Sequence, residues 1–314
     1  MQRRFKAAAL VAVVAGLSML VAGCSQYRML QARRTVKEAH LLYQQQEYKR
    51  AAQRYEETIA LDPDQTQAYF FLANSYDQLF KPSRKGEATN DGYLTKAVEY
   101  YQKAAELDKD TKMRKLALEY LVNAYGADKL NDPAQAEPLV KRMITLEPKE
   151  PTNYYVLAKM YEDSGQYELA EQTLLEAKQA RPDDPGVLLQ LAAYYNRLGE
   201  FGKTMEYLNA RAAMEPNNPE AFYTNSMYYW EKAFRDSRLK DAEKMSYIKL
   251  GIEAANKALQ LKSDYADAYT SKNLLLRSQA LIEKDPAKQQ ALIKEAEQLS
   301  AKGNELRKKK TAGA

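Results

Sequence analysis

Apolar positions recur along this chain at the period of an α-helix, separated by polar faces and turns. In one window, an apolar stripe is followed by a polar turn at Gly165, and a second stripe leads to Pro182. The two stripes consist of Tyr154, Leu157, Ala158 and Tyr161, and of Ala170, Leu174 and Ala177. Because alanine is small, the two predicted helices can approach each other closely. Pro182 ends the second helix because proline lacks the N–H that would continue it.

The same pattern covers most of the chain. Pro148, Pro182 and Pro216 lie 34 residues apart, and each ends a stretch that resembles the one before it. Upstream copies contain Ala39, Leu42, Ala51, Tyr55 and Pro63, then Tyr69, Leu72, Ala73, Tyr76, Ala97, Tyr101 and Ala104, then Leu118, Leu121, Tyr125, Ala136 and Val140. Downstream copies contain Leu188, Leu191, Ala192, Tyr195 and Leu208, then Phe222, Ser226, Tyr229, Gly251, Ala255 and Ala258, and a seventh begins at Tyr269. This period indicates stacked helix hairpins with one continuous core.

These residues and their spacing resemble the tetratricopeptide repeat. The resemblance implies an all-α fold, a right-handed α-solenoid of about six to seven helix pairs over residues 35–285. Residues 286–314 are then a capping helix with a basic tail. Departures from the repeat pattern occur at Glu38, Thr204, Asn225 and Lys272. They are typical of terminal or weakened repeats, because an end unit lacks a neighbour on one side.

The N-terminus has a second strong pattern. Basic residues precede an apolar run over residues 7–23, and Cys24 follows directly after two small residues. The segment resembles a bacterial lipoprotein signal, which implies removal of residues 1–23 and a diacylglyceryl group on the Cys24 sulfur. Residues 24–34 are then expected to be the lipidated cysteine and a short tether. A transmembrane anchor is the alternative, because 17 apolar residues are at the short limit for crossing a bilayer.

The residue after the cysteine bears on the location of the protein. Ser25 stands where aspartate marks inner-membrane retention in the best-known lipoprotein sorting rule. The resemblance therefore implies an exported, lipid-anchored protein on the outer membrane, facing the periplasm, if the host has two membranes. In a host with one membrane, the outer face of the plasma membrane is expected.

Composition argues against several classes of function. The formal net charge is +5, and three of the basic residues lie in the signal, so we expect no nucleic-acid partner. With one cysteine and one histidine, the chain offers neither a His/Cys metal cluster nor a plausible Ser/His/Asp triad. His40 is expected on the surface or in a groove of the first repeat. We therefore expect no metal, no cofactor and no enzymatic activity.

The family resemblance also suggests where a partner binds. In tetratricopeptide repeat proteins, the leading helix of each pair lines a concave groove that holds extended peptides or partner helices. The corresponding partner-binding residues here are Phe70, Asn74, Asn123, Tyr155, Lys159, Leu189, Asn196, Tyr223, Met227 and Trp230. Aromatic rings bury ligand side chains and amides bond the ligand main chain. Phe70 and Tyr155 replace lysines of the carboxylate-gripping family members, which favours an apolar or helical ligand.

Two enlarged turns offer a second candidate surface. They cover residues 80–93 and 232–244, and turns of this type project from one edge of a solenoid. We expect the first to be a flexible loop, because it contains Lys81, Pro82, Gly86 and Gly92. The second can instead lengthen the helices on either side of it. Insertions without any function are an equally good interpretation, because surface loops lengthen at little cost in free energy.

These patterns lead to one main hypothesis and two alternatives. The main hypothesis is a membrane-anchored scaffold or assembly factor of the bacterial envelope, which binds a peptide or helix of another envelope protein. The first alternative is an adaptor or activator of a cell-wall hydrolase, or a peptidoglycan-associated factor. The second is a homo-oligomer that assembles through the last repeats.

Overall fold

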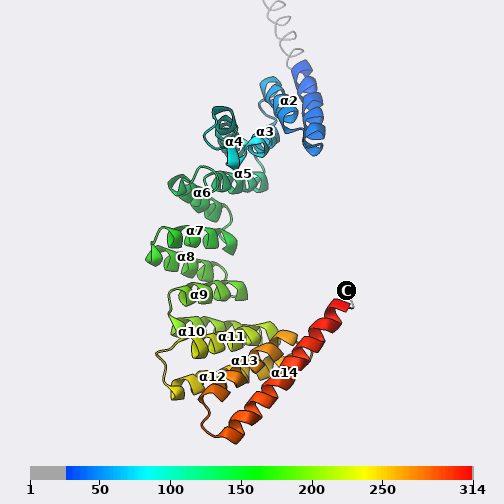
Figure 1. Cartoon of the computed structure of the whole chain (residues 1–314). Helices are drawn as coiled ribbons and strands as arrows, with labels where there is room; N and C mark the ends of the chain where they lie inside the picture. The colour runs from blue at the N-terminus through cyan, green and yellow to red at the C-terminus, as the bar shows by residue number, and fades with distance from the viewer. Residues whose placement is uncertain (1–25, 313–314) are drawn as a thin grey trace, which may run out of the picture. The chain divides into compact units, whose positions relative to one another are not determined.

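The computed structural model describes residues 26–312, and all regular structure in this part of the chain is helical (Figure 1). The first helix is described over residues 26–44, and a short 3-10 helix, η1, covers Pro82–Arg84. The remaining α-helices are α2 (Tyr48–Leu61), α3 (Thr66–Leu79), α4 (Ala88–Leu107), α5 (Thr111–Ala124), α6 (Pro133–Leu146), α7 (Pro151–Asp163), α8 (Tyr167–Ala180), α9 (Pro185–Arg197), α10 (Phe201–Met214), α11 (Pro219–Arg235), α12 (Asp241–Leu261), α13 (Ala266–Ile282) and α14 (Pro286–Ala312). The prediction of an all-α repeat solenoid is confirmed.

Local signals set the bounds of the helices, as α9 shows. The Asp184 side chain accepts a hydrogen bond from the Gly186 N–H at 2.9 Å, and Pro185 occupies the first helical position. Leu188 and Leu191 are buried on the face that packs against α10. Gly199, with φ of +77°, then makes the turn into α10 at low steric cost.

The chain forms two compact units, residues 1–160 and residues 161–314, and the boundary falls within α7. In the first unit, large aromatic and aliphatic side chains fill the core. Tyr55, Tyr101, Leu72 and Leu118 are completely buried there. Aromatic rings bury more area than any aliphatic side chain, so tyrosine supplies much of the packing that stabilises this unit.

The first helix begins earlier than the predicted tether allows. Ala32, Thr35 and Ala39 are buried, and Thr58 on α2 donates a hydrogen bond to the Thr35 hydroxyl at 2.9 Å. Arg28 also reaches α2, where its guanidinium donates to a backbone carbonyl. The expectation of a tether through residue 34 is therefore wrong for residues 26–34, because they form part of a helix and Arg28 among them contacts α2.

The first enlarged turn is folded, and the expectation of a flexible loop is wrong. Phe80 is buried in a cluster with Leu94 and Ala124. The Asn90 side chain accepts from the Lys81 N–H at 2.8 Å and donates to the Lys81 carbonyl at 3.1 Å. The Asn90 amide thus satisfies both the N–H and the carbonyl of Lys81. Phe80 packs the turn against Ala124 of the next repeat.

In the second unit, the other enlarged turn does lengthen its flanking helices. Helix α11 continues to Arg235 and α12 starts at Asp241, so only residues 236–240 connect them. The chain then returns in α13, which packs against both α11 and α12. A large part of the insertion is therefore helix.

The predicted capping helix is present as α14, which packs along α13 (Figure 1). Gly303 lies so close to the start of α13 that an added Cβ would be 3.2 Å from the Ala266 carbonyl oxygen. Lys272, a departure from the repeat pattern, pairs with Glu295 of α14 at 3.3 Å. A lysine at this repeat position is therefore accommodated, because the charged helix α14 covers the last repeat and supplies its partner.

The predicted signal and Cys24 lie outside the residues that the structure describes. Within residues 26–312, no helix has both the length and the apolar character needed to cross a bilayer.

Candidate functional site

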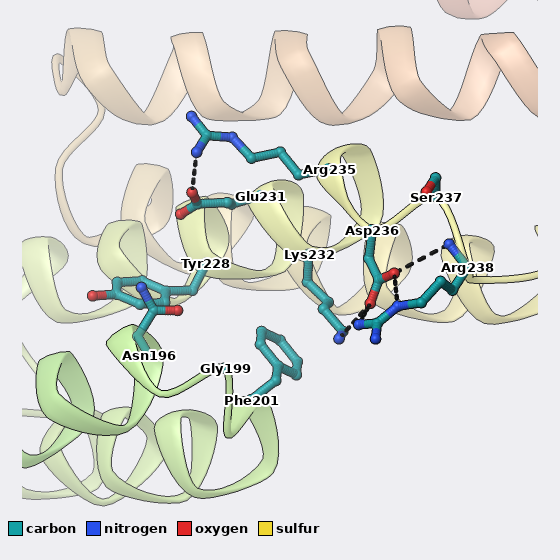
Figure 2. A pocket seen from close by; sticks show the side chains of 10 residues that line it. All are labelled: Asn196, Gly199, Phe201, Tyr228, Glu231, Lys232, Arg235, Asp236, Ser237 and Arg238. Carbon is teal, nitrogen blue, oxygen red and sulfur yellow. Dashed lines mark hydrogen bonds and ion pairs between the residues drawn. The ribbon is translucent and has the colours of Figure 1, made fainter. Parts of the chain in front are cut away.

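A pocket of about 460 Å³ opens beside α11 in the second unit (Figure 2). We call it the α11 pocket; its walls come from the end of α9, the start of α10, the second half of α11 and the turn after α11. Its lining includes Asn196, Phe201, Tyr228, Lys232, Asp236 and Arg238. The second enlarged turn therefore forms one wall of a concave site.

The start of α10 supplies the aromatic floor of the α11 pocket. The Phe201 ring makes edge contacts with the rings of Tyr229 and Tyr247, at centroid distances of 6.1 and 5.2 Å. The Lys232 ammonium lies 5.2 Å from the centre of the Phe201 ring. Because Gly199 turns the chain sharply just before it, Phe201 is placed against α11 and α12 rather than in solvent.

Asp236 organises the charges at one end of the α11 pocket (Figure 2). Its carboxylate accepts hydrogen bonds from Lys232 and from the Arg238 guanidinium, both at 2.9 Å, and also from the Arg238 N–H. The Arg238 and Lys232 bonds hold the pKa of Asp236 well below its usual range, so it stays ionised. Its side chain is only 12% exposed, whereas Arg238 is 86% exposed.

Polar groups at the other end of the α11 pocket are available to a ligand. Asn196 at the end of α9 and Tyr228 on α11 both line the pocket and are drawn in Figure 2. Among the described residues, neither side chain has a hydrogen-bond partner. Burial raises the pKa of the half-buried Tyr228 hydroxyl, which therefore remains protonated and can donate. The pocket thus combines an aromatic floor with an unpaired amide and hydroxyl.

A stacked aromatic pair, one partly buried and one exposed, lies on the same helix. The rings of Trp230 and Phe234 stack at a centroid distance of 5.3 Å, and Phe234 is 57% exposed. Large exposed aromatic side chains are the residues that most often anchor protein partners. Helix α11 therefore carries exposed apolar area and the polar lining of the pocket along one stretch.

The structure overturns the expected exposure of two predicted partner-binding residues in the first unit. Phe70 is 5% exposed and packs against the rings of Tyr101 and Tyr120. Asn74 is 2% exposed, accepting from Tyr43 at 2.6 Å and donating to Tyr101 at 3.0 Å. The expectation that these two line an open groove is wrong, because neighbouring tyrosines fill the space.

The other predicted residues remain at least partly exposed. Asn123, Lys159 and Asn196 are exposed, while Tyr155, Leu189, Tyr223, Met227 and Trp230 are partly buried. The Tyr223 ring contacts the Tyr265 ring of α13 at 5.4 Å. Of the ten predicted residues, Asn196 is the one that lines the α11 pocket. Binding by the others stays a prediction.

A smaller pocket of about 350 Å³ lies in the first unit, beside the other enlarged turn. Tyr76 donates to Glu56 at 2.6 Å, and Lys96 donates to the Tyr76 hydroxyl at 2.9 Å, so these three lining side chains bond one another. Gly92 and Tyr93, within the turn residues 80–93, also line it. These three paired side chains are therefore less available to a ligand than Asn196 and Tyr228 of the α11 pocket are.

Sequence reasoning missed several lining residues, although one signal pointed to them. Phe201 and Tyr228 were absent from the predicted set, while Lys232, Asp236 and Arg238 fall within the enlarged turn at 232–244. That turn was recognisable in the sequence because the repeat residues on its two sides, Tyr229 and Gly251, lie further apart than their counterparts in other copies. Nothing in the repeat pattern indicated which of its side chains face the end of α9.

Within residues 26–312, no group of three or more histidine, cysteine and carboxylate side chains is arranged to hold a metal ion. His40 is half-buried rather than exposed in a groove, and its Nδ1 lies 2.6 Å from the Tyr55 hydroxyl. Its imidazole is therefore part of the aromatic packing of the first unit.

Two segments of the chain match family patterns described as tetratricopeptide repeat, residues 36–111 and residues 129–193. No curated protein matches the sequence. Among solved structures, the C-terminal part of a tetratricopeptide repeat-containing protein from Cytophaga hutchinsonii is 16% identical, with a TM-score of 0.55, over 86% of this chain and 98% of that one. This likeness shows a shared fold.

Weaker likenesses extend to other repeat proteins. A tetratricopeptide repeat protein from Parabacteroides merdae is 13% identical, with a TM-score of 0.43, over 84% of this chain and 98% of its own. PilW, described as a widely conserved type IV pilus biogenesis factor, is 18% identical, with a TM-score of 0.39, over 76% and 96%. Scores at this level carry no inference about function. Residues 36–111 and 129–193 therefore match the tetratricopeptide repeat, and the solved structure shows that the fold is shared over most of the chain.

Proposed function

We propose that this protein is a lipid-anchored scaffold of the bacterial cell envelope that binds a segment of a partner protein in the α11 pocket, without catalysis. The observation that carries the binding proposal is the pocket itself. It combines a phenylalanine floor with the unpaired Asn196 amide and Tyr228 hydroxyl. Specific protein contacts use this combination, in which apolar anchors provide affinity and a few polar groups provide orientation.

The anchor part of the proposal rests on the N-terminal sequence. A basic start, an apolar run and Cys24 after small residues support export and lipidation. Two acyl chains hold a protein stably on a membrane, whereas one gives only reversible attachment. Location on the outer membrane follows from Ser25 if the host has two membranes.

The anchor is tested with Cys24→Ala. We expect wild-type protein in the membrane fraction, with mass spectrometry showing diacylglycerol on Cys24, and variant protein that is unprocessed and unlipidated. Replacement of the following residue, Ser25→Ala, leaves the acceptor cysteine intact and is the matched control. An unmodified Cys24 thiol on wild-type protein would refute the lipid anchor.

Partner binding is tested by crosslinking in intact cells, followed by purification and mass spectrometry. Asn196→Arg fills the pocket from an exposed position, and Tyr228→Ala removes its hydroxyl and ring. The control is Tyr167→Ala, because Tyr167 on α8 is 48% exposed and does not line the pocket. We expect at least one envelope protein to be captured by wild type and control and lost from both pocket variants. An unchanged set of partners would exclude the α11 pocket as the site.

A cell-wall assay separates a scaffold from an enzyme. Purified protein is incubated with isolated peptidoglycan, alone and with any hydrolase recovered by crosslinking. We expect no release of muropeptides by the protein alone. Release would contradict the proposal, whereas stimulation of a recovered hydrolase would identify that hydrolase as the partner.

A further inference from the structure

A second concave site lies in the second unit, where the start of α13 meets the end of α14. It is a cleft of about 640 Å³ between the turn from α12 to α13 and the final turns of α14. Its lining includes Lys262, Tyr265, Asp267, Arg307, Lys309 and Lys310. We call it the C-terminal cleft. It shares no residue with the α11 pocket.

Specific contacts along α13 fix the position of α14 and hence the shape of the cleft. The Gln289 amide donates to the Ala280 carbonyl at 2.9 Å near one end of the pair. Near the other end, Arg307 donates to Asp267 and to the Thr270 hydroxyl, both at 2.8 Å. These contacts show that α13 and α14 run antiparallel, with Arg307 beside the first turn of α13.

The end of α14 therefore extends beyond the start of α13. Residues 308–312 follow Arg307 and have no further turn of α13 beside them. This overhang contains three consecutive lysines, Lys308, Lys309 and Lys310. The last turn of α14 is thus a basic wall, facing Lys262 at the end of α12.

Most of the local carboxylates are already paired with other cations. Asp267 pairs with Arg307, and Glu305 pairs with Lys302 and Lys309. Within residues 26–312, no carboxylate lies in ion-pair distance of Lys262, Lys308 or Lys310. Asp264, at the same turn, is the one further carboxylate in the cleft lining. The cleft therefore has an excess of positive charge that the protein itself does not neutralise.

We propose that the C-terminal cleft binds an acidic segment of a partner protein, whose carboxylates pair with Lys262 and Lys310. Charge complementarity of this kind speeds association and selects the partner. The concave shape and the aromatic wall at Tyr265 suit a peptide chain, whereas a bilayer presents a broad surface that cannot enter a cleft. Burial raises the pKa of Tyr265 to about 12, so its hydroxyl remains a donor for a carboxylate at neutral pH. This inference does not depend on the α11 pocket.

The test measures binding of fluorescein-labelled hexaglutamate to the detergent-solubilised full chain by fluorescence anisotropy. We expect binding at low ionic strength that weakens as salt is added. The double variant Lys262→Glu, Lys310→Glu is expected to bind about tenfold more weakly, because each change replaces attraction by repulsion. Deletion of residues 308–314 is a second variant that keeps the Arg307 contacts, and it is also expected to weaken binding.

The matched control is Lys288→Glu, Lys294→Glu, which makes the same change in net charge at exposed positions of α14 far from the cleft. It is expected to bind hexaglutamate like wild type. Equal binding by the cleft variant and the control would overturn the proposal. So would failure to bind hexaglutamate together with cleft-dependent binding of phosphatidylglycerol vesicles or of a DNA duplex. Partner capture through the α11 pocket is expected to survive the cleft variant, so the two proposals fail separately.

Discussion

At the residue scale, the buried Asn74 joins the buried Tyr101 to the partly buried Tyr43. Its oxygen accepts from Tyr43 and its nitrogen donates to Tyr101. Asn74→Ala leaves both hydroxyls unsatisfied, and we expect it to lower the free energy of unfolding by about 1–3 kcal/mol. Chemical denaturation followed by circular dichroism measures this.

Asn123 provides the comparison for that experiment. It is the same residue type at an exposed position of the neighbouring helix α5. We expect Asn123→Ala to change the free energy of unfolding by no more than about 0.5 kcal/mol. Equal effects of the two substitutions would show that the buried network does not stabilise the fold.

We expect His40 to make the stability of the first unit depend on pH. Burial lowers its pKa below the ordinary value of 6.5, and its Nδ1 lies 2.6 Å from the Tyr55 hydroxyl. The unfolded chain therefore takes up the proton first as pH falls, so the folded state loses stability below about pH 6.5. We expect the melting temperature of wild type to fall between about pH 7 and pH 5 more steeply than that of His40→Gln. Parallel curves for the two proteins would contradict this role.

At the element scale, Gly251 allows three helices of the second unit to meet. A Cβ at this position would lie 2.7 Å from a methyl carbon of Leu275 on α13 and 3.2 Å from the Cβ of Tyr229 on α11. Gly251→Ala is therefore expected to lower the free energy of unfolding by about 1–3 kcal/mol, although alanine is the better helix former.

Gly92→Ala is the control for this prediction. Gly92 lies within α4, and no atom stands within 4 Å of an added Cβ. We expect a gain in stability of roughly 0.5–1 kcal/mol, because alanine loses less backbone entropy in a helix. Thermal denaturation of both variants separates helix propensity from packing, and a stabilised Gly251→Ala protein would be inconsistent with the close contact.

At the scale of the whole molecule, the division into two compact units leads us to predict that a deletion at one end destabilises only the helices near it. Each repeat contacts its sequence neighbours, so stability in a stack is close to a sum of nearest-neighbour contributions. Deletion of residues 284–314 removes α14 and exposes the face of α13 that α14 covers. We expect faster amide hydrogen exchange in α11–α13 and unchanged exchange in α2–α5. Faster exchange throughout the chain would instead indicate a single cooperative unit.

Much of the helical architecture was readable from the sequence. The stripes around Leu72, Leu118 and Leu191 predicted buried positions, and each of these side chains is fully buried. Helical periodicity and proline punctuation are local signals, because a helix satisfies its backbone within one segment. The departure at Lys272 was also visible, but its partner Glu295 belongs to a helix with no repeat pattern.

The candidate site was less accessible to such reasoning. The enlarged turn at 232–244 was identified, yet the choice of Tyr228 and Phe201 as lining residues depends on how α9, α10 and α11 pack together. Likewise, Phe70 and Asn74 occupy positions expected to face a groove. Side chains from other helices bury them: Tyr101 and Tyr120 pack against Phe70, and Tyr43 bonds to Asn74.

The sequence by itself determined the repeat, the helical class, the capping helix and the expectation of a lipid anchor at Cys24, because each follows from contiguous residues and fixed spacing. Tertiary structure alone decided which surfaces stay open. A cleft exists where side chains from distant segments fail to fill the space between helices, as at the α11 pocket and the C-terminal cleft. Large tyrosines close the equivalent positions around Asn74, since close packing leaves no room beside them.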